Sequence, residues 1–175
     1  MKIRKATWED LSEILAIYAR ARRFMEENGN PTQWGKDWPP ETAVRSDIEN
    51  GHGYVAAEET DPGTRGKVLA VCHYRFGPDT EETYRVIDGA WKREGPYGVI
   101  HRIAGDGERH GVFRAALAYA EGITGHLRID THRDNRTMRR LIGEAGFREC
   151  GVIRVRNGSP RIAYEKLENS SERNE

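Results

Sequence analysis

The chain has 175 residues, of which 28 are Lys or Arg and 28 are Asp or Glu, so its formal net charge is zero. This balance argues against broad, non-specific binding to nucleic acid, which needs an excess of basic residues. This length is ample for a central sheet with helices on both faces, and the 32% of charged residues predicts a heavily charged surface. We expect residues 1–167 to form a single domain and residues 168–175 to form a polar C-terminal tail.

Neither a membrane span nor an export signal is visible in the sequence. No apolar run approaches the roughly 20 residues that a membrane-spanning helix needs. The N-terminal sequence MKIRKATWED lacks the apolar core of a signal peptide. The two cysteines, Cys72 and Cys150, lie in apolar stretches without metal-ligand spacing, which is typical of buried, reduced thiols. These features predict a cytoplasmic protein that does not act at a membrane.

The first half of the chain predicts a strand, two helices and two further strands. Thr7 and Asp10 form a capping-box pattern ahead of apolar residues at helical spacing. Asn50-Gly51 is a stop signal for the second helix. The expected elements are a strand over 1–6, a helix to about 27, a structured loop over 28–40, a helix over 41–49, and strands over 54–58 and 68–74.

The second half alternates strands and helices after a long connection over residues 77–96. We expect a short helix near 84–91 within this connection. Asn157-Gly158 is a strong hairpin signal between the last two strands. The further elements expected are a strand over 97–104, a helix from about 112, a strand over 127–131, a helix over 135–144 ending at Gly146, and strands over 147–155 and 161–167.

The order of these elements predicts an α/β (α+β) fold. The strand-helix-strand unit over 97–131 should be a right-handed crossover, which places its two strands parallel. The other strands should pair antiparallel. We therefore expect a mixed, mostly antiparallel central sheet flanked by helices on both faces.

A glycine-bearing loop between the strand over 97–104 and the next helix is the stretch that predicts chemistry. Backbone N–H groups at a helix start are unpaired and carry partial positive charge, and glycine lets a phosphate approach the backbone closely. The arrangement suits a pyrophosphate, although on spacing alone an ordinary strand-to-helix turn explains it equally well. The residues concerned are Gly105, Gly107 and Gly111, with the basic side chains of Arg109, His110 and Arg114.

Two other nucleotide-binding patterns fail in this loop. The P-loop pattern GxxxxGK[ST] does not occur in the chain. The dinucleotide pattern GxGxxG fits at Gly105 and Gly107, but its last position is His110, one residue before Gly111. The loop also comes late in the chain, which leaves no room for a full dinucleotide-binding fold.

On these residues the chain resembles the GCN5-related N-acetyltransferases, over residues 1 to about 167. The family's pyrophosphate loop, Q/R-x-x-G-x-G/A before a helix, is similar to the stretch ERHGVF at 108–113. Gly111 matches the central glycine, whereas Glu108 and Phe113 depart from the pattern. A second stretch, RIDTHRDNRTMRRLIGEAGF at 128–147, is similar to the family's strand, Asn-led helix and Gly-Phe turn.

The resemblance implies the acyl-CoA N-acyltransferase type of fold and acetyl-CoA as co-substrate. No metal is expected, because the histidines lack metal-ligand spacing. The resemblance also implies that the strands over 97–104 and 127–131 splay apart at their C-terminal ends. The pantetheine arm would then pair with backbone near Ile103. For Asn135, a plain N-cap of the following helix is an equally good explanation. The residues expected to bind the cofactor are Ile103, Ala104, Arg109, His110, Gly111, Val112, Phe113, Arg114, Asn135 and Met138.

The resemblance also implies direct attack of an amine on the thioester, with a backbone N–H near Ile103 stabilising the oxyanion. Many relatives place a tyrosine acid where this chain has Ile142. The catalytic candidates are His132, Tyr164 and His101, although a structural histidine is the simpler interpretation of both histidines.

Alternation along a strand predicts that at most one of His101 and Arg102 faces the cleft. The remaining histidines, His52, His73 and His126, are scattered without metal-ligand spacing.

The acceptor is expected to be the amine of a small molecule or peptide, and neither nucleic acid nor a membrane is expected as partner. Trp34 and Tyr74 are the expected substrate-binding residues, although Trp34 would equally serve to pin its loop to the body. The assembly is left open between a monomer and a homodimer. Two other functions also stay open, a non-catalytic acyl-CoA binding module and an interaction domain whose loop binds nothing.

Overall fold

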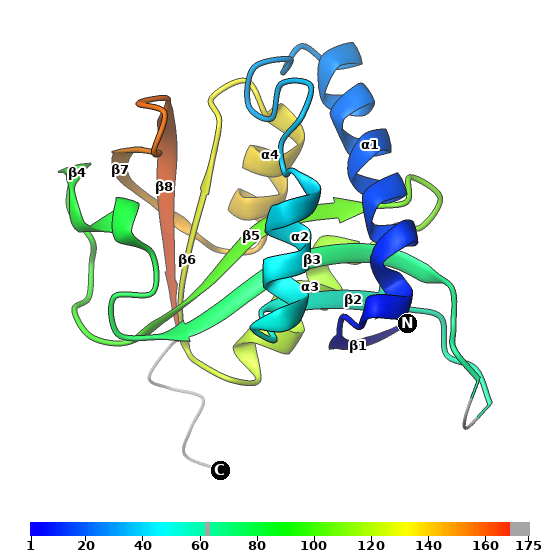
Figure 1. The fold of residues 1–175 in the computed structure, drawn as a ribbon. Helices are drawn as coiled ribbons and strands as arrows, with labels where there is room; N and C mark the ends of the chain where they lie inside the picture. The colour runs from blue at the N-terminus through cyan, green and yellow to red at the C-terminus, as the bar shows by residue number, and fades with distance from the viewer. Residues whose placement is uncertain (62–63, 169–175) are drawn as a thin grey trace. The chain divides into compact units, whose positions relative to one another are not determined.

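The computed structural model describes residues 1–61 and 64–168 (Figure 1). The predicted tail beyond Glu168 lies outside the described residues. None of the described helices has both the length and the apolar character needed to cross a membrane. The helices are η1 (Trp8–Asp10), α1 (Leu11–Glu27), α2 (Glu41–Glu49), η2 (Glu82–Arg85), α3 (Val112–Glu121) and α4 (Arg136–Glu144). The strands are β1 (Lys2–Lys5), β2 (Gly53–Ala57), β3 (Val68–Gly77), β4 (Ile87–Gly89), β5 (Tyr97–Gly105), β6 (His126–Thr131), β7 (Arg148–Arg154) and β8 (Pro160–Leu167).

The eight strands hydrogen-bond in the order β1-β2-β3-β5-β6-β8-β7-β4. β5 and β6 are parallel, as the strand-helix-strand pattern predicts, with Gly98 beside Leu127 and Val99 beside Arg128. The pairs β1–β2, β2–β3, β4–β7, β6–β8 and β7–β8 are antiparallel. The predicted mixed, mostly antiparallel sheet is therefore confirmed.

Two compact units make up the chain. The first consists of Met1–Arg75 with Ile100–Tyr119, and the second of Phe76–Val99 with the chain from Ala120 onwards. The strand β5 contributes its first three residues to the second unit and the rest to the first. The expectation of a single domain over 1–167 stays a prediction.

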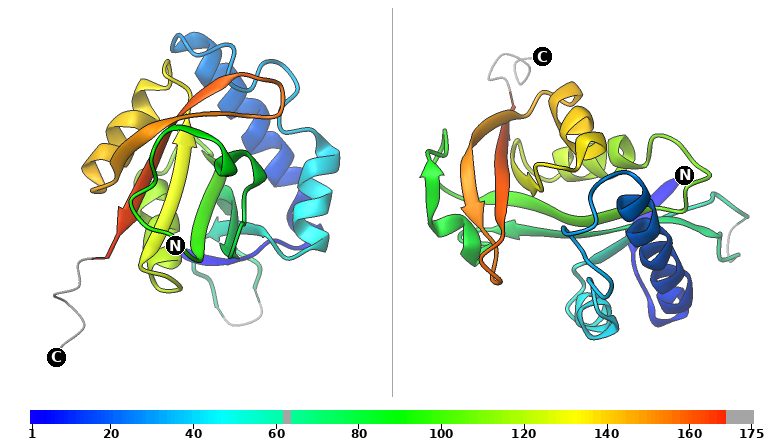
Figure 2. Two further views of the ribbon diagram at one scale, coloured as in Figure 1. Left: turned by 90° about the vertical axis from the view of Figure 1, so that its left-hand side faces the viewer. Right: turned by 90° about the horizontal axis from the view of Figure 1, so that it is seen from above.

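In the first unit, helices cover both faces of the strands (Figure 2). Ile14 and Tyr18 of α1 pack with Val44 of α2 against Val55 and Val71, in one buried cluster. The residues that alternate with these strand positions point to the other face. There Ala56, Ala70 and Cys72 lie with Val112 and Ala116 of α3 around a small apolar space.

The start of the first helical segment confirms the predicted capping box. The Thr7 N–H donates to the Asp10 carboxylate over 2.8 Å. Asp10 is fully buried and also accepts two hydrogen bonds from Arg4, over 2.6 and 2.8 Å. Although burial alone would raise the pKa of this carboxyl, the hydrogen bonds from Arg4 and Thr7 hold the pKa well below its usual range.

In the second unit, the helix expected near 84–91 is wrong. The chain forms only the short 3-10 helix η2, followed by the three-residue strand β4. The Trp91 indole N–H donates to the Tyr84 carbonyl over 2.9 Å and so occupies an acceptor that a continuing helix would need. The Tyr84 ring packs on Trp91 and Tyr97, and this aromatic contact replaces helical hydrogen bonding as the local organiser.

The last part of the second unit follows its local sequence signals. The Asn135 side chain accepts from the Met138 N–H over 3.1 Å, which makes it the N-cap of α4. Gly146 adopts a φ of +84° after α4, a left-handed conformation that favours glycine. Gly158 adopts a φ of +80° in the turn between β7 and β8, and its N–H donates to Val155 over 2.7 Å. The predicted cap, helix end and hairpin are all confirmed.

Candidate functional site

An irregular residue interrupts β5 within the first unit. Arg102 has a φ of +51°, in the left-handed region that residues other than glycine rarely adopt. The Tyr18 hydroxyl, which comes from α1, donates to the Arg102 carbonyl over 3.0 Å. Such a conformation persists only where its surroundings hold it, and it is typical of functional sites.

The side chain of Arg102 is held by an acid, whose side chain is 13% exposed, and by a histidine. Its Nη2 lies 2.7 and 2.6 Å from the two carboxylate oxygens of Asp47 in α2. The same nitrogen lies 2.7 Å from Nδ1 of His73 in β3. His73 Nδ1 is also 2.8 Å from Asp47. Asp47, His73 and Arg102 therefore form one three-way contact, which we call the Asp47 cluster.

Two more histidines border the Asp47 cluster. The His73 ring centroid lies 5.7 Å from that of His52 and 6.0 Å from that of His101. Both His101 and Arg102 contact His73, while the expectation that at most one of the two faces the cofactor cleft stays a prediction. The left-handed φ of Arg102 breaks the alternation on which that expectation depended.

Electrostatics keep the Asp47 cluster in a defined charge state. Burial and then the positive charge of Arg102 lower the pKa of His73 to about 4, against the pull of Asp47 in the other direction. Burial alone would raise the pKa of Asp47, but the His73 hydrogen bond and the Arg102 charge lower it. At neutral pH the cluster thus holds a carboxylate, a guanidinium and a neutral imidazole. That imidazole can donate from Nδ1 to Asp47 or accept there from Arg102.

The glycine-bearing loop after β5 is ordered by its own acid. Asp106 is 3% exposed, and its Oδ1 accepts from the N–H groups of Glu108 and Arg109 over 2.9 and 3.1 Å. The Asp106 carbonyl accepts a hydrogen bond from Arg20 of α1. The start of the ERHGVF stretch is therefore bound by a side chain of the protein, which the sequence did not predict.

The end of the loop presents the start of α3. Gly111 has a φ of +82° and is exposed, and an added Cβ there would meet nothing within 4 Å. His110 and Arg114 are also exposed, whereas Phe113 is buried at 8% exposure. Arg109 extends to within 3.8 Å of Glu58. The Gly111 end of the loop thus has open space beside the first turn of a ten-residue helix.

Comparisons with known proteins were made by sequence and by structure. No protein-family model matches the chain, and no curated protein sequence matches it. Solved structures do match. A GNAT-family acetyltransferase from Streptococcus agalactiae is 27% identical, with a TM-score of 0.82 over 96% of this chain and 95% of that one. One from Listeria monocytogenes is 20% identical, with a TM-score of 0.66 over 95% and 94%. The NatB acetyltransferase complex bound to CoA and MES is 12% identical, with a TM-score of 0.56 over 97% and 100%.

The chain has the fold of the GCN5-related N-acetyltransferases. In the terms of this fold, Ile103 and Ala104 lie on β5 directly after the irregular Arg102. Ala104 belongs to the buried cluster under α1 and α2, and Ile103 borders the apolar space under α3. Their predicted role in binding the cofactor stays a prediction.

The second unit of this acetyltransferase fold holds four further predicted site residues. His132 is buried at 8% exposure, and burial followed by the charge of Arg161 lowers its pKa. Tyr164 is buried on β8, and burial raises its pKa. Asn135 serves as the α4 cap, and Met138 lies half-buried in the first turn of α4. These positions leave the roles predicted for the four residues untested.

The two predicted acceptor-binding residues both pack against the body of the first unit. Trp34 is half-buried, with its ring edge-on to Tyr18 at 5.6 Å, as expected if it pins its loop. Tyr74 is 4% exposed and packs against Tyr54 and Tyr119 at 6.0 and 6.4 Å. Contact of either residue with an acceptor stays a prediction.

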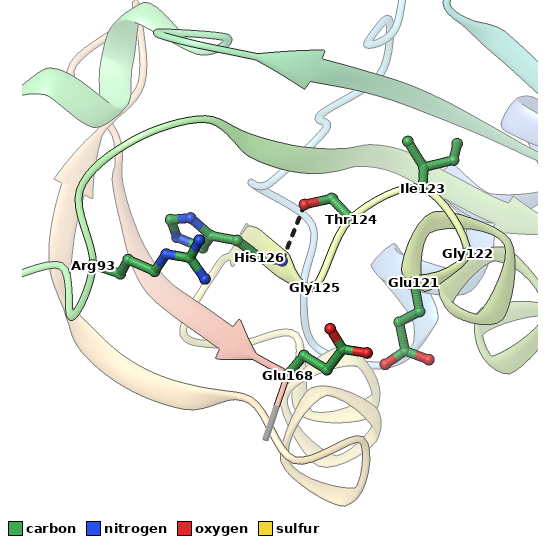
Figure 3. Close-up of a pocket in the computed structure, with 8 residues that line it drawn as sticks. All are labelled: Arg93, Glu121, Gly122, Ile123, Thr124, Gly125, His126 and Glu168. Atoms are coloured by element: carbon green, nitrogen blue, oxygen red, sulfur yellow. Dashed lines mark hydrogen bonds between the residues drawn. The ribbon is translucent and has the colours of Figure 1, made fainter. Parts of the chain in front are cut away.

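A polar pocket at the start of β6 is separate from every predicted site residue (Figure 3). Glu121 and Glu168 border it, together with Arg93 and the backbone around Gly125. The His126 N–H donates to the Thr124 hydroxyl over 3.1 Å at its edge. In the part of the chain that the structure describes, no group of three or more His, Cys, Asp or Glu side chains could hold a metal ion.

Sequence reasoning missed the Asp47 cluster altogether. Its three members are 26, 29 and 55 residues apart in pairs, and they come from a helix and two strands. No spacing within a single element could have joined them. The three histidines that looked scattered or merely structural are neighbours only in the folded unit.

Proposed function

We propose that this chain is an N-acetyltransferase that transfers acetyl from acetyl-CoA to a primary amine by direct attack. The observation that carries the proposal is the helix start at Gly111, which follows the irregular β5 across the loop over residues 106–111 in an acetyltransferase fold. Amide N–H groups of the first helical turn, beside an exposed glycine, suit the diphosphate of coenzyme A. A solved neighbour with this fold, the NatB complex, binds CoA.

The reaction needs few groups from the protein. The amine nitrogen attacks the thioester carbonyl, its excess proton passes to a base, and the carbon–sulfur bond breaks to release the thiolate of coenzyme A. The Ile103 N–H is proposed to stabilise the oxyanion formed on the way. A thiol has a pKa well below that of an alcohol, so the leaving group does not strictly need an acid.

Three side chains are the candidates for proton transfer, two as the base and one as an acid for the leaving group. His101 borders the neutral His73 in the first unit and is a candidate base. His132 in the second unit has a lowered pKa, so its imidazole is neutral and able to accept a proton. Tyr164 has a raised pKa, so its hydroxyl stays protonated and suits an acid. Trp34 and Tyr74 remain the proposed acceptor-binding residues.

A non-catalytic acyl-CoA binding module is the second candidate. The position where many relatives have a tyrosine acid holds Ile142, whose side chain is fully buried. A buried isoleucine in place of this acid is compatible with a protein that binds the coenzyme without turning it over.

Calorimetry and a thiol-release assay separate the candidates. We expect binding of both acetyl-CoA and CoA, and thiol release with at least one member of a panel of polyamines, amino acids, aminoglycosides and peptide N-termini. Binding without release from any amine would favour the binding module. No binding of either ligand would overturn both candidates.

Gly111 offers a test with a matched control. Gly111→Asp should weaken acetyl-CoA binding at least tenfold, because it places a negative charge beside the proposed diphosphate. Gly111→Asn has nearly the same size and tolerates a positive φ equally well, but it adds no charge. Calorimetry at low and high salt should show the difference between the two variants shrinking with salt. Equal affinities of folded Asp and Asn variants would contradict this placement.

A further inference from the structure

The peptide group that joins Arg102 to Ile103 is fixed by a hydrogen bond to its carbonyl oxygen. The Tyr18 hydroxyl donates to the Arg102 oxygen over 3.0 Å. Among the described residues the cis peptide bond is Trp38-Pro39, so the bond between Arg102 and Ile103 is trans. In a planar trans peptide the carbonyl and the following N–H point in opposite directions. Fixing the Arg102 carbonyl therefore fixes the direction of the Ile103 N–H.

The same residue is held a second time through its side chain. Asp47 contacts the Arg102 guanidinium through both carboxylate oxygens, and His73 contacts it through Nδ1. These contacts bear on a residue whose φ of +51° is unfavourable for an arginine. Without them, the backbone at Arg102 would be expected to relax toward a regular strand, and the following N–H would turn with it.

The interactions of the Tyr18 hydroxyl are directed at Arg102, through a hydrogen bond to its carbonyl and an electrostatic interaction with its side chain. Tyr18 is 1% exposed and lies in a cluster of apolar side chains that a phenylalanine would fill equally well. Burial raises the pKa of this hydroxyl well above its usual range, so it remains a donor at any physiological pH. A buried hydroxyl placed on one strained carbonyl is an orienting contact.

We infer that Tyr18 and the Asp47–His73 pair are positioning residues, which aim the Ile103 N–H at the carbonyl oxygen of the bound thioester. This inference rests on the proposed acetyl transfer and on Ile103 as the oxyanion donor. Neither Tyr18 nor Asp47 needs to touch the substrate. Both act through Arg102, one on its backbone and one on its side chain.

Tyr18→Phe is the direct test, because it removes one oxygen atom from a packed site. We expect kcat to fall at least tenfold, while KM for acetyl-CoA changes less than twofold and the pH dependence of kcat keeps its shape. Tyr54→Phe is the matched control, since it removes a buried hydroxyl from the same unit without a contact to Arg102. It should leave kcat within twofold of the wild-type value.

A spectroscopic measurement reports the oxyanion donor itself. A hydrogen bond to a thioester carbonyl lowers its stretching frequency, which isotope-edited infrared spectra of bound ¹³C-acetyl-CoA detect. We expect a shift to lower frequency in the wild-type complex, and most of that shift to be lost in Tyr18→Phe. Asp47→Asn weakens the contact with the Arg102 guanidinium and leaves the Tyr18 hydroxyl in place. It should also lower kcat and reduce the shift in carbonyl frequency, as Tyr18→Phe does.

The outcomes separate this inference from the proposed function. If the wild-type protein transfers acetyl to no amine in the panel, the proposed function fails and the inference fails with it. If the wild type is active, but folded Tyr18→Phe matches it in kcat and in carbonyl frequency, the inference is wrong and the proposed function stands. A lowered melting temperature with unchanged kcat would likewise show that the Tyr18 contact is purely structural.

Discussion

The two units each join one carboxylate with one histidine and one arginine, and the two clusters differ in how far they are shielded from solvent. In the second unit, Glu165 accepts from His126 Nε2 over 2.7 Å and from Arg128 Nε over 3.0 Å. The Arg128 guanidinium lies between two aromatic rings, 4.2 Å from Trp91 and 4.1 Å from Tyr97. We call this group the Glu165 cluster, and its carboxylate has no exposed surface.

The Asp47 cluster of the first unit has the same chemical members without that enclosure. Its three side chains keep between 11% and 17% exposure, and its arginine sits in a strained backbone conformation. The rings of His52 and His101 lie next to His73, and no pair of aromatic rings is described on either side of the Arg102 guanidinium. The difference teaches that an acid–histidine–arginine group is not by itself a sign of function. Residual access and backbone strain distinguish the Asp47 cluster from the Glu165 cluster, and they agree with the positioning role that we infer for it.

The largest difference in stability between the two clusters is expected when the charge of the central carboxylate, Glu165 or Asp47, is removed. Glu165→Gln leaves the Arg128 guanidinium buried without its counterion, so the free energy of unfolding should fall by about 3–5 kcal/mol. Asp47→Asn should cost roughly 1–2 kcal/mol, because water can reach its partners. Denaturant unfolding at pH 7 measures both. Equal losses would remove the distinction between the clusters.

The next contrast is a dependence on pH. The pKa of His73 is lowered to about 4 in the folded chain from 6.5 when unfolded, so between these values the unfolded chain binds the additional proton. Stability from this source is complete above pH 6.5 and is lost as the pH falls toward 4, by about 3 kcal/mol at most. His73→Asn should therefore show a flatter pH dependence of the unfolding free energy over this range than the wild type. The exposed His110→Asn serves as control, and its curve should parallel that of the wild type.

The smallest contrast concerns the two arginines. Arg128→Lys loses the planar contact with two rings and the hydrogen bond to the Arg93 carbonyl at 2.6 Å, so we expect a loss of about 1–2 kcal/mol in unfolding free energy. Arg102→Lys keeps a charge beside Asp47 and has no aromatic stack to lose, so its loss should stay under about 1 kcal/mol. A larger loss at Arg102 than at Arg128 in thermal unfolding would reverse the comparison.

Local signals were enough to predict most of the fold. The Thr7–Asp10 box, the Asn135 cap and the turns at Gly146 and Gly158 depend on residues close together in the chain, and the structure confirms each of them. The parallel pairing of β5 with β6 followed from the strand-helix-strand order. The one wrong element, near 84–91, depends on contacts of Tyr84 with Trp91 and Tyr97 that helical periodicity does not encode.

The candidate site was predicted only in its glycine loop and in the resemblance that the loop supports. The Asp47 cluster escaped because its members come from separate elements and because φ at Arg102 departs from a regular strand. Side chains alternate between the two faces of a strand only where the backbone is extended, and a single residue with a left-handed φ interrupts this alternation. The role of Asp106 escaped for a similar reason, since nothing in its sequence neighbourhood shows that its carboxylate turns back onto the loop.

That turned-back carboxylate has a consequence for the thermodynamics of ligand binding. Because Asp106 already orders the backbone from residue 106 to 109, an arriving ligand does not have to freeze those residues. Preorganisation of this kind lowers the entropic cost of association and leaves more of the contact energy for affinity. The Asp106 carboxylate therefore fixes the conformation of this part of the loop before an anionic ligand reaches it.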